Sequence, residues 1–265
     1  MCNKFTGYSY GGKPSEEAAR LAKQAASFVE HDLPLLERLG LSKGMNVLDV
    51  GCGAGTVTVE LAKFVSPGQV VGIDRDGALI EQATKSVLPS DVNIQFLKDD
   101  ILTTKLAENS FDFVYCRFVL WAIPQRVLAL ENMIRLAKIQ GTICAQEPDA
   151  SGTIYWPDIP AHYSYWNGRI RYHQDKQDGI DPNLGRKLFM LFKQLGLLEI
   201  KFGVSGLYKD NFDWQTSTEE YVGPGADAIR AGYIDKQVLV ERAEWASNPL
   251  SFMMFPTIVV AGRKP

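Results

Sequence analysis

The sequence has 265 residues, of which 46% are hydrophobic and 22% charged, and its formal net charge is −3. This length suffices for one large core and leaves little room for a second, so residues 1–265 predict a single domain with insertions. The basic residues are scattered along the chain, which disfavours a nucleic-acid partner.

The N-terminal residues and the cysteines indicate a cytoplasmic protein. The first residues are polar and lack the apolar centre of a signal peptide, and no apolar run reaches membrane-spanning length. The four cysteines lie far apart, without the spacing of a metal site or a disulfide framework. We therefore expect reduced thiols, no membrane partner and no bound metal, while the oligomeric state stays open.

Short apolar runs alternate with helical segments in the first half of the chain. Residues 1–14 combine aromatic residues with glycine and predict an arm or lid. A helix is expected from Ser15, which can cap it. The runs "NVLDVG", "VVGID" and "NIQFL" then alternate with helices. This order is typical of a doubly wound parallel α/β sheet, and we assign residues 15–148 to it as the cofactor-binding core.

The alternation of strands and helices ends after Glu147. Residues 149–182 are rich in Trp, Tyr, His and Pro, and we predict that they form an aromatic cap insertion. Residues 183–265 are expected to complete the sheet, with a helical insertion over 211–247 and a last strand within "SFMMFPTIVVAGRKP". Because the arm and the cap both interrupt the pattern, we expect them to form a mobile cover over a binding site.

The stretch "VLDVGCGAGTVTVELA" connects a buried strand to a helix through Gly51, Gly53 and Gly55. Glycine accepts positive φ and lets a ligand approach the main chain. A tight turn without a ligand needs fewer glycines, and the carboxyl edge of such a sheet is where ligands bind. The spacing is tighter than the G-x-G-x-x-G of dinucleotide sites. The carboxylate of Asp49 would also disfavour a pyrophosphate and attract an ammonium group.

Acidic residues end the next two predicted strands. Asp74 follows "VVGI", where a carboxylate can accept both hydroxyl groups of a ribose. Asp99 and Asp100 follow "NIQFLK", where a carboxylate can accept a hydrogen bond from an adenine amino group. Taken singly, each acid is also explained as a turn former or a solvated loop residue. Together with the glycine loop they predict a nucleoside pocket.

These stretches, with "NSFDFVYCRFVLWAIP" and "GTICAQEPD" in the same order, resemble the class I S-adenosylmethionine-dependent methyltransferases, especially the small-molecule branch. The resemblance covers residues 15–150. It implies a Rossmann-like sheet of seven strands, mostly parallel, with an antiparallel last strand.

The resemblance also implies S-adenosylmethionine as the cofactor. The glycine loop would receive the methionine moiety, Asp74 the ribose, and Asp100 with the Ile101 amide the adenine. The family usually has Gly-Asp where this chain has Asp99-Asp100, so the acid that contacts adenine is left open. The expected cofactor residues are Asp49, Gly51, Gly53, Gly55, Asp74, Arg75, Asp99, Asp100, Ile101 and Cys116.

The acceptor is expected between the loop after the fourth strand and the cap. A phenol, acid or carbon acceptor would gain from a base, whereas an amine needs only its lone pair. His162 and His173 are the candidate bases, and ordinary solvated histidines are the alternative. The candidate acceptor-binding residues are aromatic and could instead form the core of the insertion: Tyr10, Phe118, Trp121, Trp156, Tyr163 and Trp166.

The sequence thus predicts methyl transfer from S-adenosylmethionine to an N, O or C atom of a small aromatic or apolar acceptor, as in natural product biosynthesis. Two alternatives would use the same pocket: a nicotinamide-dependent oxidoreductase, and a non-catalytic module that binds the cofactor without transferring its methyl group. Binding assays with both cofactors separate the first alternative, and a transfer assay separates the second.

Overall fold

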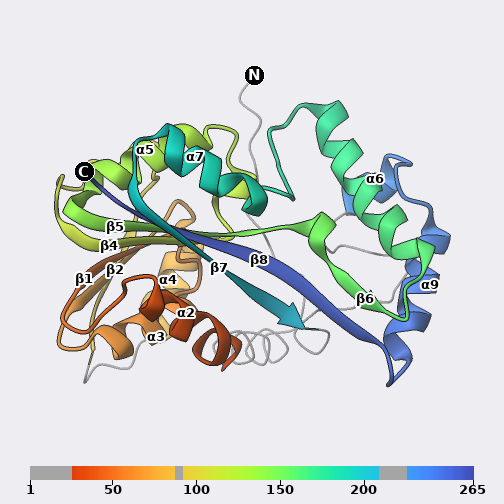
Figure 1. The fold of residues 1–265 in the computed structure, drawn as a ribbon, viewed down its shortest axis with the longest axis horizontal. Coiled ribbons are helices and arrows are strands. Elements are labelled where there is room, and N and C mark those ends of the chain that lie inside the picture. The colour runs from red at the N-terminus through yellow and green to blue at the C-terminus, as the bar shows by residue number, and fades with distance from the viewer. Residues whose placement is uncertain (1–25, 87–91, 209–225) are drawn as a thin grey trace.

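The computed structural model describes residues 26–86, 92–208 and 226–265 (Figure 1). The strands are β1 (Asn46–Val50), β2 (Gln69–Asp74), β3 (Asn93–Lys98), β4 (Phe111–Arg117), β5 (Ala137–Pro148), β6 (Ile154–Trp156), β7 (Leu198–Tyr208) and β8 (Phe252–Arg263). The α-helices are α2 (Leu33–Arg38), α3 (Thr56–Val65), α4 (Gly77–Ser86), α5 (Arg126–Leu136), α6 (Pro160–Lys176), α7 (Leu188–Gln194), α8 (Ala226–Arg230) and α9 (Lys236–Ser247). Short helical segments are the π-helix η1 (Phe28–Asp32) and the 3-10 turns η2 (Leu120–Ala122), η3 (Ala150–Gly152) and η4 (Gly185–Lys187).

The strands form one sheet in the order β3-β2-β1-β4-β5-β8-β6, with β7 paired to β8. Strands β1 to β5 are parallel, and β8 is antiparallel to β5, β6 and β7. The predicted doubly wound, mostly parallel sheet with an antiparallel last strand is confirmed. The described residues contain eight strands where seven were expected, because the short β6 pairs with the beginning of the long β8.

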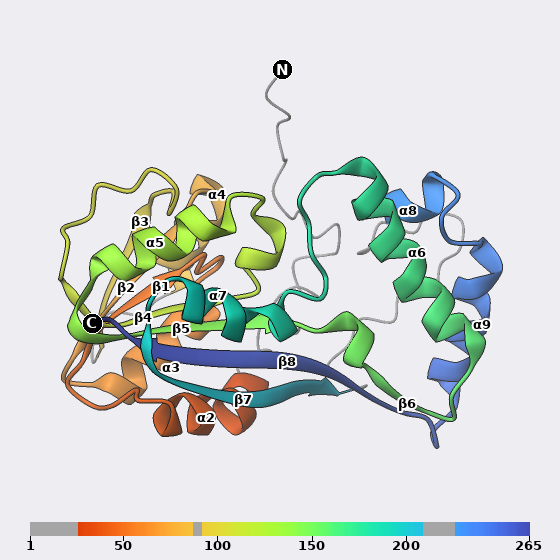
Figure 2. The same cartoon turned by 45° about the horizontal axis from the view of Figure 1, so that its top comes forward.

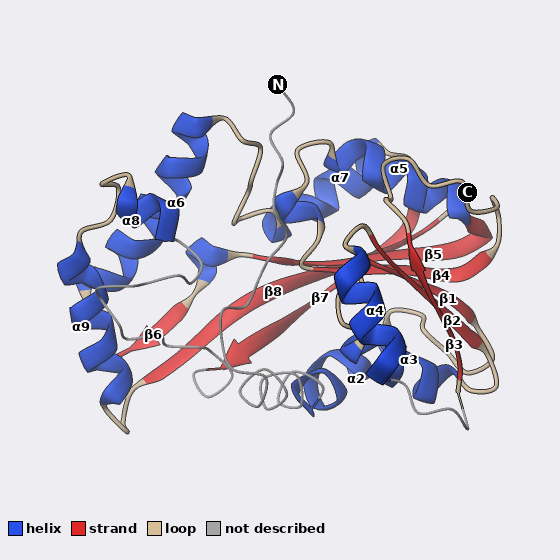
Figure 3. Cartoon of the chain, turned by 180° about the vertical axis from the view of Figure 1, so that it is seen from behind, coloured by secondary structure: helices blue, strands red, loops and turns tan. Residues whose placement is uncertain are grey.

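Helices cover both faces of the sheet (Figures 1 and 3). On one face α5 and α7 pack on side chains that include Leu48 and Val50 of β1, and on the other α2 and α3 pack on Val47. Successive side chains of a strand point to opposite faces, so one apolar strand supplies both cores. Because β1 to β5 are parallel, their carboxyl ends lie at one edge of the sheet, where the loops that follow them can meet.

A helical cap, which we define as β6, α6, α8 and α9, lies beyond the carboxyl end of β5 (Figures 1 and 2). The cap has its own core of aromatic and aliphatic side chains from two stretches far apart in the sequence: Ala150, Tyr155, Tyr165, Trp166, Ala228, Ile234, Leu239, Trp245, Met253 and Phe255. Met253 and Phe255, in the first half of β8, belong to this core. In the described ranges, no helix is long and apolar enough to cross a bilayer.

Candidate active site

The glycine loop lies between β1 and α3, where Gly51, Gly53 and Gly55 have φ angles of 71°, 56° and 80°. These angles lie in the left-handed region that favours glycine. A Cβ atom at Gly51 would lie 2.4 Å from a methyl group of Val119, and one at Gly55 would lie 2.6 Å from the ring of Phe96. A Cβ atom at Gly53 would meet no atom of the described residues within 4 Å. The middle glycine therefore borders open space in which a ligand can approach the main chain.

Asp49 is buried at the end of β1, with 3% of its surface exposed. Its Oδ2 accepts a hydrogen bond from Thr58 Oγ1 at 2.7 Å. Burial raises the pKa of Asp49 to about 7; the Thr58 hydrogen bond and the charge of Arg117 oppose this shift, and the charge of Asp74 adds to it. The carboxylate is thus poorly compensated, and a cation bound beside it would be stabilised.

Asp74 connects the end of β2 to the glycine loop. Its Oδ2 accepts a hydrogen bond from the Gly53 amide at 3.0 Å, and its Oδ1 accepts one from the Asp76 amide at 2.9 Å. A carboxylate has about four acceptor positions, so Asp74 can still accept hydrogen bonds from two hydroxyl groups. The neighbouring Arg75 is exposed. The fold therefore brings Asp74 and the glycine loop together.

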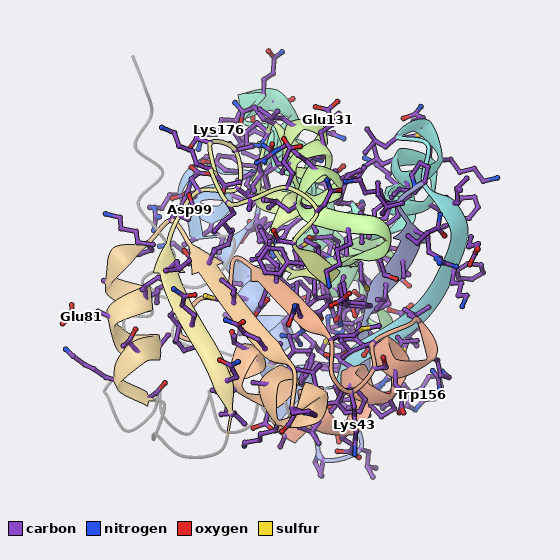
Figure 4. All side chains as sticks on the ribbon, turned by 90° about the vertical axis from the view of Figure 1, so that its left-hand side faces the viewer. Lys43, Glu81, Asp99, Glu131, Trp156 and Lys176 are labelled. Carbon is purple, nitrogen blue, oxygen red and sulfur yellow. The ribbon has the colours of Figure 1, made fainter. Side chains whose placement is uncertain are left out.

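The two acids after β3 have different partners. Asp99, which Figure 4 shows at the end of β3, accepts hydrogen bonds from Thr104 Oγ1 at 2.5 Å and from the Asp100 amide at 2.8 Å. Asp100 accepts one from the Leu102 amide through Oδ1 at 2.9 Å, and its Oδ2 has no hydrogen-bond partner among the described residues. Asp99 therefore holds its own turn with both oxygens, whereas Asp100 keeps one oxygen for a ligand. Ile101, the next residue, is buried.

Two of the described cysteines lie near the ends of β1 and β4. Cys116, expected beside the cofactor, is buried at the end of β4, and Cys52 lies in the glycine loop. Burial raises the pKa of both thiols, so they stay protonated rather than becoming nucleophilic thiolates. Within the part of the chain that the structure describes, no three His, Cys, Asp or Glu residues are grouped to hold a metal ion.

Glu147, near the end of β5, is a site residue that the sequence reasoning missed. It is fully buried, and its carboxylate accepts hydrogen bonds from the amides of Val119 at 3.1 Å, Leu120 at 2.8 Å and Trp121 at 3.2 Å. Burial raises its pKa to about 7, although the three amides oppose the shift. Glu147 thereby holds the loop after β4, whose Val119 packs against Gly51. The sequence feature that could have identified Glu147 is its position near the carboxyl end of a predicted strand.

The loop after β4 carries Phe118 at a φ of 56°, a conformation that residues other than glycine rarely adopt. The Phe118 amide donates to Gln146 O at 2.9 Å, and Trp121 Nε1 donates to Phe118 O at 3.0 Å. The guanidinium of Arg117 lies 4.7 Å from the centre of the Phe118 ring, and its Nε lies 3.3 Å from Asp32 Oδ2. The surroundings thus determine the conformation of Phe118, which directly follows β4, and of Trp121 in η2.

His162 lies inside the cap core. Its ring is fully buried, stacked on Tyr155 at 3.7 Å and edge-on to Trp245 at 4.6 Å. Neither ring nitrogen has a hydrogen-bond partner in the described part of the chain. Burial, together with the charge of Arg242, lowers the pKa of His162 to about 3, although the charge of Asp158 opposes this shift. A ring in this position has no access to an acceptor.

The aromatic residues of the cap divide between its core and its surface. Trp166 is a core residue with 7% of its surface exposed, and its Nε1 donates to the Tyr155 hydroxyl at 2.5 Å. Trp156 and Tyr163 are 69% and 55% exposed. The insertion therefore uses part of its aromatic content to fold itself, as one sequence alternative allowed. Tyr10 and the predicted arm lie outside the described residues.

His173 lies near the end of α6, and its Nδ1 is 2.9 Å from Asp178 Oδ2. The chain then returns to the loop after β4, where the Asp181 amide donates to Trp121 O at 2.8 Å. Of the two candidate bases, His173 is therefore the one that the fold links to the predicted acceptor loop.

The profile of the family described as "Methyltransferase domain" matches residues 41–184 of this chain. The chain belongs to the class I S-adenosylmethionine-dependent methyltransferases. The matched segment contains the glycine loop, the acids after β2 and β3, and the loop after β4. The family resemblance seen in the sequence is confirmed, S-adenosylmethionine is the cofactor of this methyltransferase, and its place in the small-molecule branch stays a prediction.

Curated relatives of the methyltransferase cover only parts of it. It is 26% identical to an uncharacterized methyltransferase of Schizosaccharomyces pombe over 187 residues, which are 68% of this chain and 64% of the relative. It is 34% identical to a demethylmenaquinone methyltransferase of Staphylococcus aureus over 125 residues, which are 46% of this chain and 52% of the relative. The chain thus spans between about half and two thirds of the length of these relatives.

Solved structures share the fold of the methyltransferase. One is a SAM-dependent methyltransferase from Methanosarcina mazei, with a TM-score of 0.56 and 16% identity, covering 87% of this chain and 97% of that one. Another is phosphoethanolamine N-methyltransferase 2 of Haemonchus contortus in complex with S-adenosyl-L-methionine, with a TM-score of 0.51 and 18% identity, covering 88% and 52%. Nothing in these matches favours a nicotinamide-dependent oxidoreductase.

Proposed function

We propose that this protein transfers the methyl group of S-adenosylmethionine to a small aromatic or apolar acceptor in the cytoplasm. The observation that carries the proposal is the open main chain at Gly53, in the loop that follows β1 and its buried carboxylate, Asp49. The positively charged end of the cofactor would compensate that carboxylate. Because the relatives extend beyond the matched region, the activity and the substrates of the whole protein are part of the proposal.

The residues of the site fit the cofactor. When bound, S-adenosylmethionine supplies an electrophilic methyl group on a positively charged sulfur. Asp49 would stabilise the charged end, Asp74 would accept the ribose hydroxyl groups, and Asp100 with the Ile101 amide would bind the adenine. Since Asp74 also accepts the Gly53 amide, a single carboxylate would position the ribose and hold the loop at the methionine end.

The acceptor would lie against the loop after β4. Glu147 and the Arg117–Asp32 ion pair hold this loop, which would let Phe118 and Trp121 orient a flat ring without moving. The cover of the acceptor by residues 1–14 and 149–182 stays a proposal, and within that insertion Trp156 pairs with Phe252 at the far end of β8 and Tyr163 bonds to Asp158. An aromatic pocket of this kind suits the intermediates of natural product biosynthesis better than nucleic acid.

Two glycine variants test the proposal. Gly53 and Gly44 both have positive φ and open space around a new Cβ atom, but Gly44 precedes β1 at the opposite end of the strand. Gly53→Ala and Gly44→Ala should therefore cost similar folding free energy, on the order of 1 kcal/mol. We expect only Gly53→Ala to weaken binding of S-adenosylhomocysteine, at least about tenfold by calorimetry.

Equal affinity of the two glycine variants would place the cofactor elsewhere. Parallel titrations with NAD separate the oxidoreductase alternative, because the parent protein is expected to bind S-adenosylhomocysteine and not NAD. Binding of the cofactor without transfer to any acceptor would instead identify a non-catalytic module.

A further inference from the structure

His173 and Asp178 form a hydrogen-bonded pair at the end of α6. Nδ1 of His173 lies 2.9 Å from Asp178 Oδ2, and the two side chains are only 13% and 16% exposed. The Ile180 amide donates to Asp178 Oδ1 at 3.0 Å and so holds the carboxylate in place. An ionised carboxylate only accepts, so in the neutral ring the hydrogen would lie on Nδ1 and Nε2 would keep a free lone pair. Within the described residues, Nε2 has no hydrogen-bond partner.

The segment that follows the pair is attached to the acceptor loop. The Asp181 amide donates to Trp121 O, and Arg126 at the start of α5 lies 3.3 Å from Asp181 Oδ2 and donates to Gly179 O. Gly179 packs so closely on Pro124 that a Cβ atom there would lie 2.7 Å away. These contacts keep the pair at a constant place relative to Trp121.

The neighbouring Lys176 does not take the place of His173 as the partner of Asp178 or as a proton acceptor. Nζ of Lys176 lies 3.8 Å from Asp178 Oδ2, beyond hydrogen-bond distance, and donates to the Tyr172 hydroxyl at 3.2 Å. That hydrogen bond raises the pKa of Lys176. Lys176 therefore remains protonated and cannot accept a proton, and the carboxylate of Asp178 stays engaged with His173.

We infer that His173 is the general base of this methyltransferase, that Asp178 positions it, and that the acceptor carries an acidic proton, as a phenol or an enol does. The inference rests on the proposed function. An amine attacks through a lone pair that is already free and needs no base. A base held by a second, buried group is the arrangement that activates a protonated nucleophile.

The proton and the electron pairs balance in this step. Nε2 of His173 removes the proton of the acceptor as the acceptor oxygen or carbon forms its bond to the methyl carbon. The carbon–sulfur bond breaks, and the sulfur keeps the electron pair as a neutral thioether. The carboxylate of Asp178 stabilises the imidazolium, which then returns its proton to water. The step needs no oxidant or reductant.

Histidine side-chain NMR tests the pair without any acceptor. The chain has three histidines, so each ¹⁵N-labelled ring can be followed. We expect the Nδ1–H tautomer of His173 in the parent and the Nε2–H tautomer in Asp178→Ala. The control Asp175→Ala changes a residue of α6 that bonds to Tyr233 instead, and it should leave the tautomer unchanged. An Nε2–H tautomer in the parent would overturn the inference.

A titration with S-adenosylhomocysteine separates this inference from the proposed function. Calorimetry reports whether the ligand binds, and we expect binding to shift the NMR signals of His173. Absence of binding would contradict the proposed function and thereby the role assigned to the pair. Binding that leaves the His173 signals unchanged would remove only His173 from the site.

Turnover with a labelled methyl group, measured over a panel of phenols and amines, tests the acceptor class. We expect the parent to methylate phenols and His173→Ala to lose about 100-fold or more in turnover, with unchanged affinity for S-adenosylhomocysteine. A smaller loss is expected in Asp178→Ala, because the base is present but poorly oriented. A parent that methylates no phenol of the panel, or a His173→Ala variant with full turnover, would overturn the inference.

Discussion

The half of the molecule built on β1 to β5 and the cap use polar side chains differently. At the carboxyl edge of the sheet, acids such as Asp74, Asp100 and Glu147 accept hydrogen bonds from backbone amides of the adjoining turns. In the cap, by contrast, His162 and Arg169 are surrounded by aromatic rings; His162 stacks on Tyr155, and the guanidinium of Arg169 lies 4.9 Å from the ring centre of Trp166. The acids at the sheet edge thus have backbone partners from the turns of the proposed site, whereas the polar groups of the cap pack against aromatic rings.

The largest expected effect is a loss of stability that is confined to the cap. Trp166→Ala should cost about 3–5 kcal/mol of cap stability, because it removes a large side chain from the cap core. Hydrogen exchange should then accelerate in α6 and α9 and stay slow in β1 and β4. The control Trp156→Ala, at a residue 69% exposed, should change stability by no more than about 0.5 kcal/mol. Equal acceleration in both regions would show that they unfold as one unit.

The next expected effect is the cost of the buried Asp49 carboxylate to the free energy of unfolding. Its pKa is raised in the folded state from 3.8 to about 7, so the folded protein binds a proton that the unfolded chain releases. The free energy of unfolding must therefore fall as pH rises through this window, by roughly 1.4 kcal/mol per pH unit.

Asp49→Asn should remove this pH dependence. At pH 8 the variant should be more stable than the parent by on the order of 3 kcal/mol, and at pH 4 the two should be alike in urea unfolding. Its affinity for S-adenosylhomocysteine should fall, because the negative charge is lost. A stability difference that is the same at both pH values would contradict the assignment.

A further variant concerns the carboxylate that links β2 to the glycine loop. Asp74→Ala should lose about 1.5–3 kcal/mol of binding free energy for S-adenosylhomocysteine, or about tenfold or more in affinity. Asp76→Ala is the control, since Asp76 Oδ1 accepts only the amide of Ala78 in the same turn. Calorimetry that finds both variants equally impaired would assign the loss to the turn rather than to the ribose contact.

The smallest expected effect distinguishes the two acids after β3. Asp100→Ala should weaken binding of S-adenosylhomocysteine by about 1 kcal/mol, because Asp100 has the free oxygen. Asp99→Ala should leave the affinity unchanged and lower the melting temperature, because Thr104 loses its partner. The opposite pattern in calorimetry and thermal unfolding would assign adenine to Asp99.

Local patterns were sufficient to predict much of the sheet half. The three glycines at 51, 53 and 55 and the acids at strand ends are adjacent in sequence to the structure that requires them, so their place follows from the strands alone. The same rule could have found Glu147. What it could not show is that Asp99 bonds to Thr104 while Asp100 keeps an oxygen free, because those contacts depend on the course of the loop.

The sequence by itself determined the alternating strands and helices of β1 to β5 and the edge at which a ligand is expected, because apolar periodicity and glycine conformation act over a few residues. Only the tertiary structure shows that the two histidines of α6 have different surroundings. His162 is buried because α6 packs against α9, which lies far along the chain, and His173 meets Asp178 because the chain turns back toward Trp121. The burial of His162 arises from contacts with a distant segment, so no local pattern in the sequence contains it. His173 and Asp178 are close in sequence, but their place beside Trp121 depends on the fold of the chain between them.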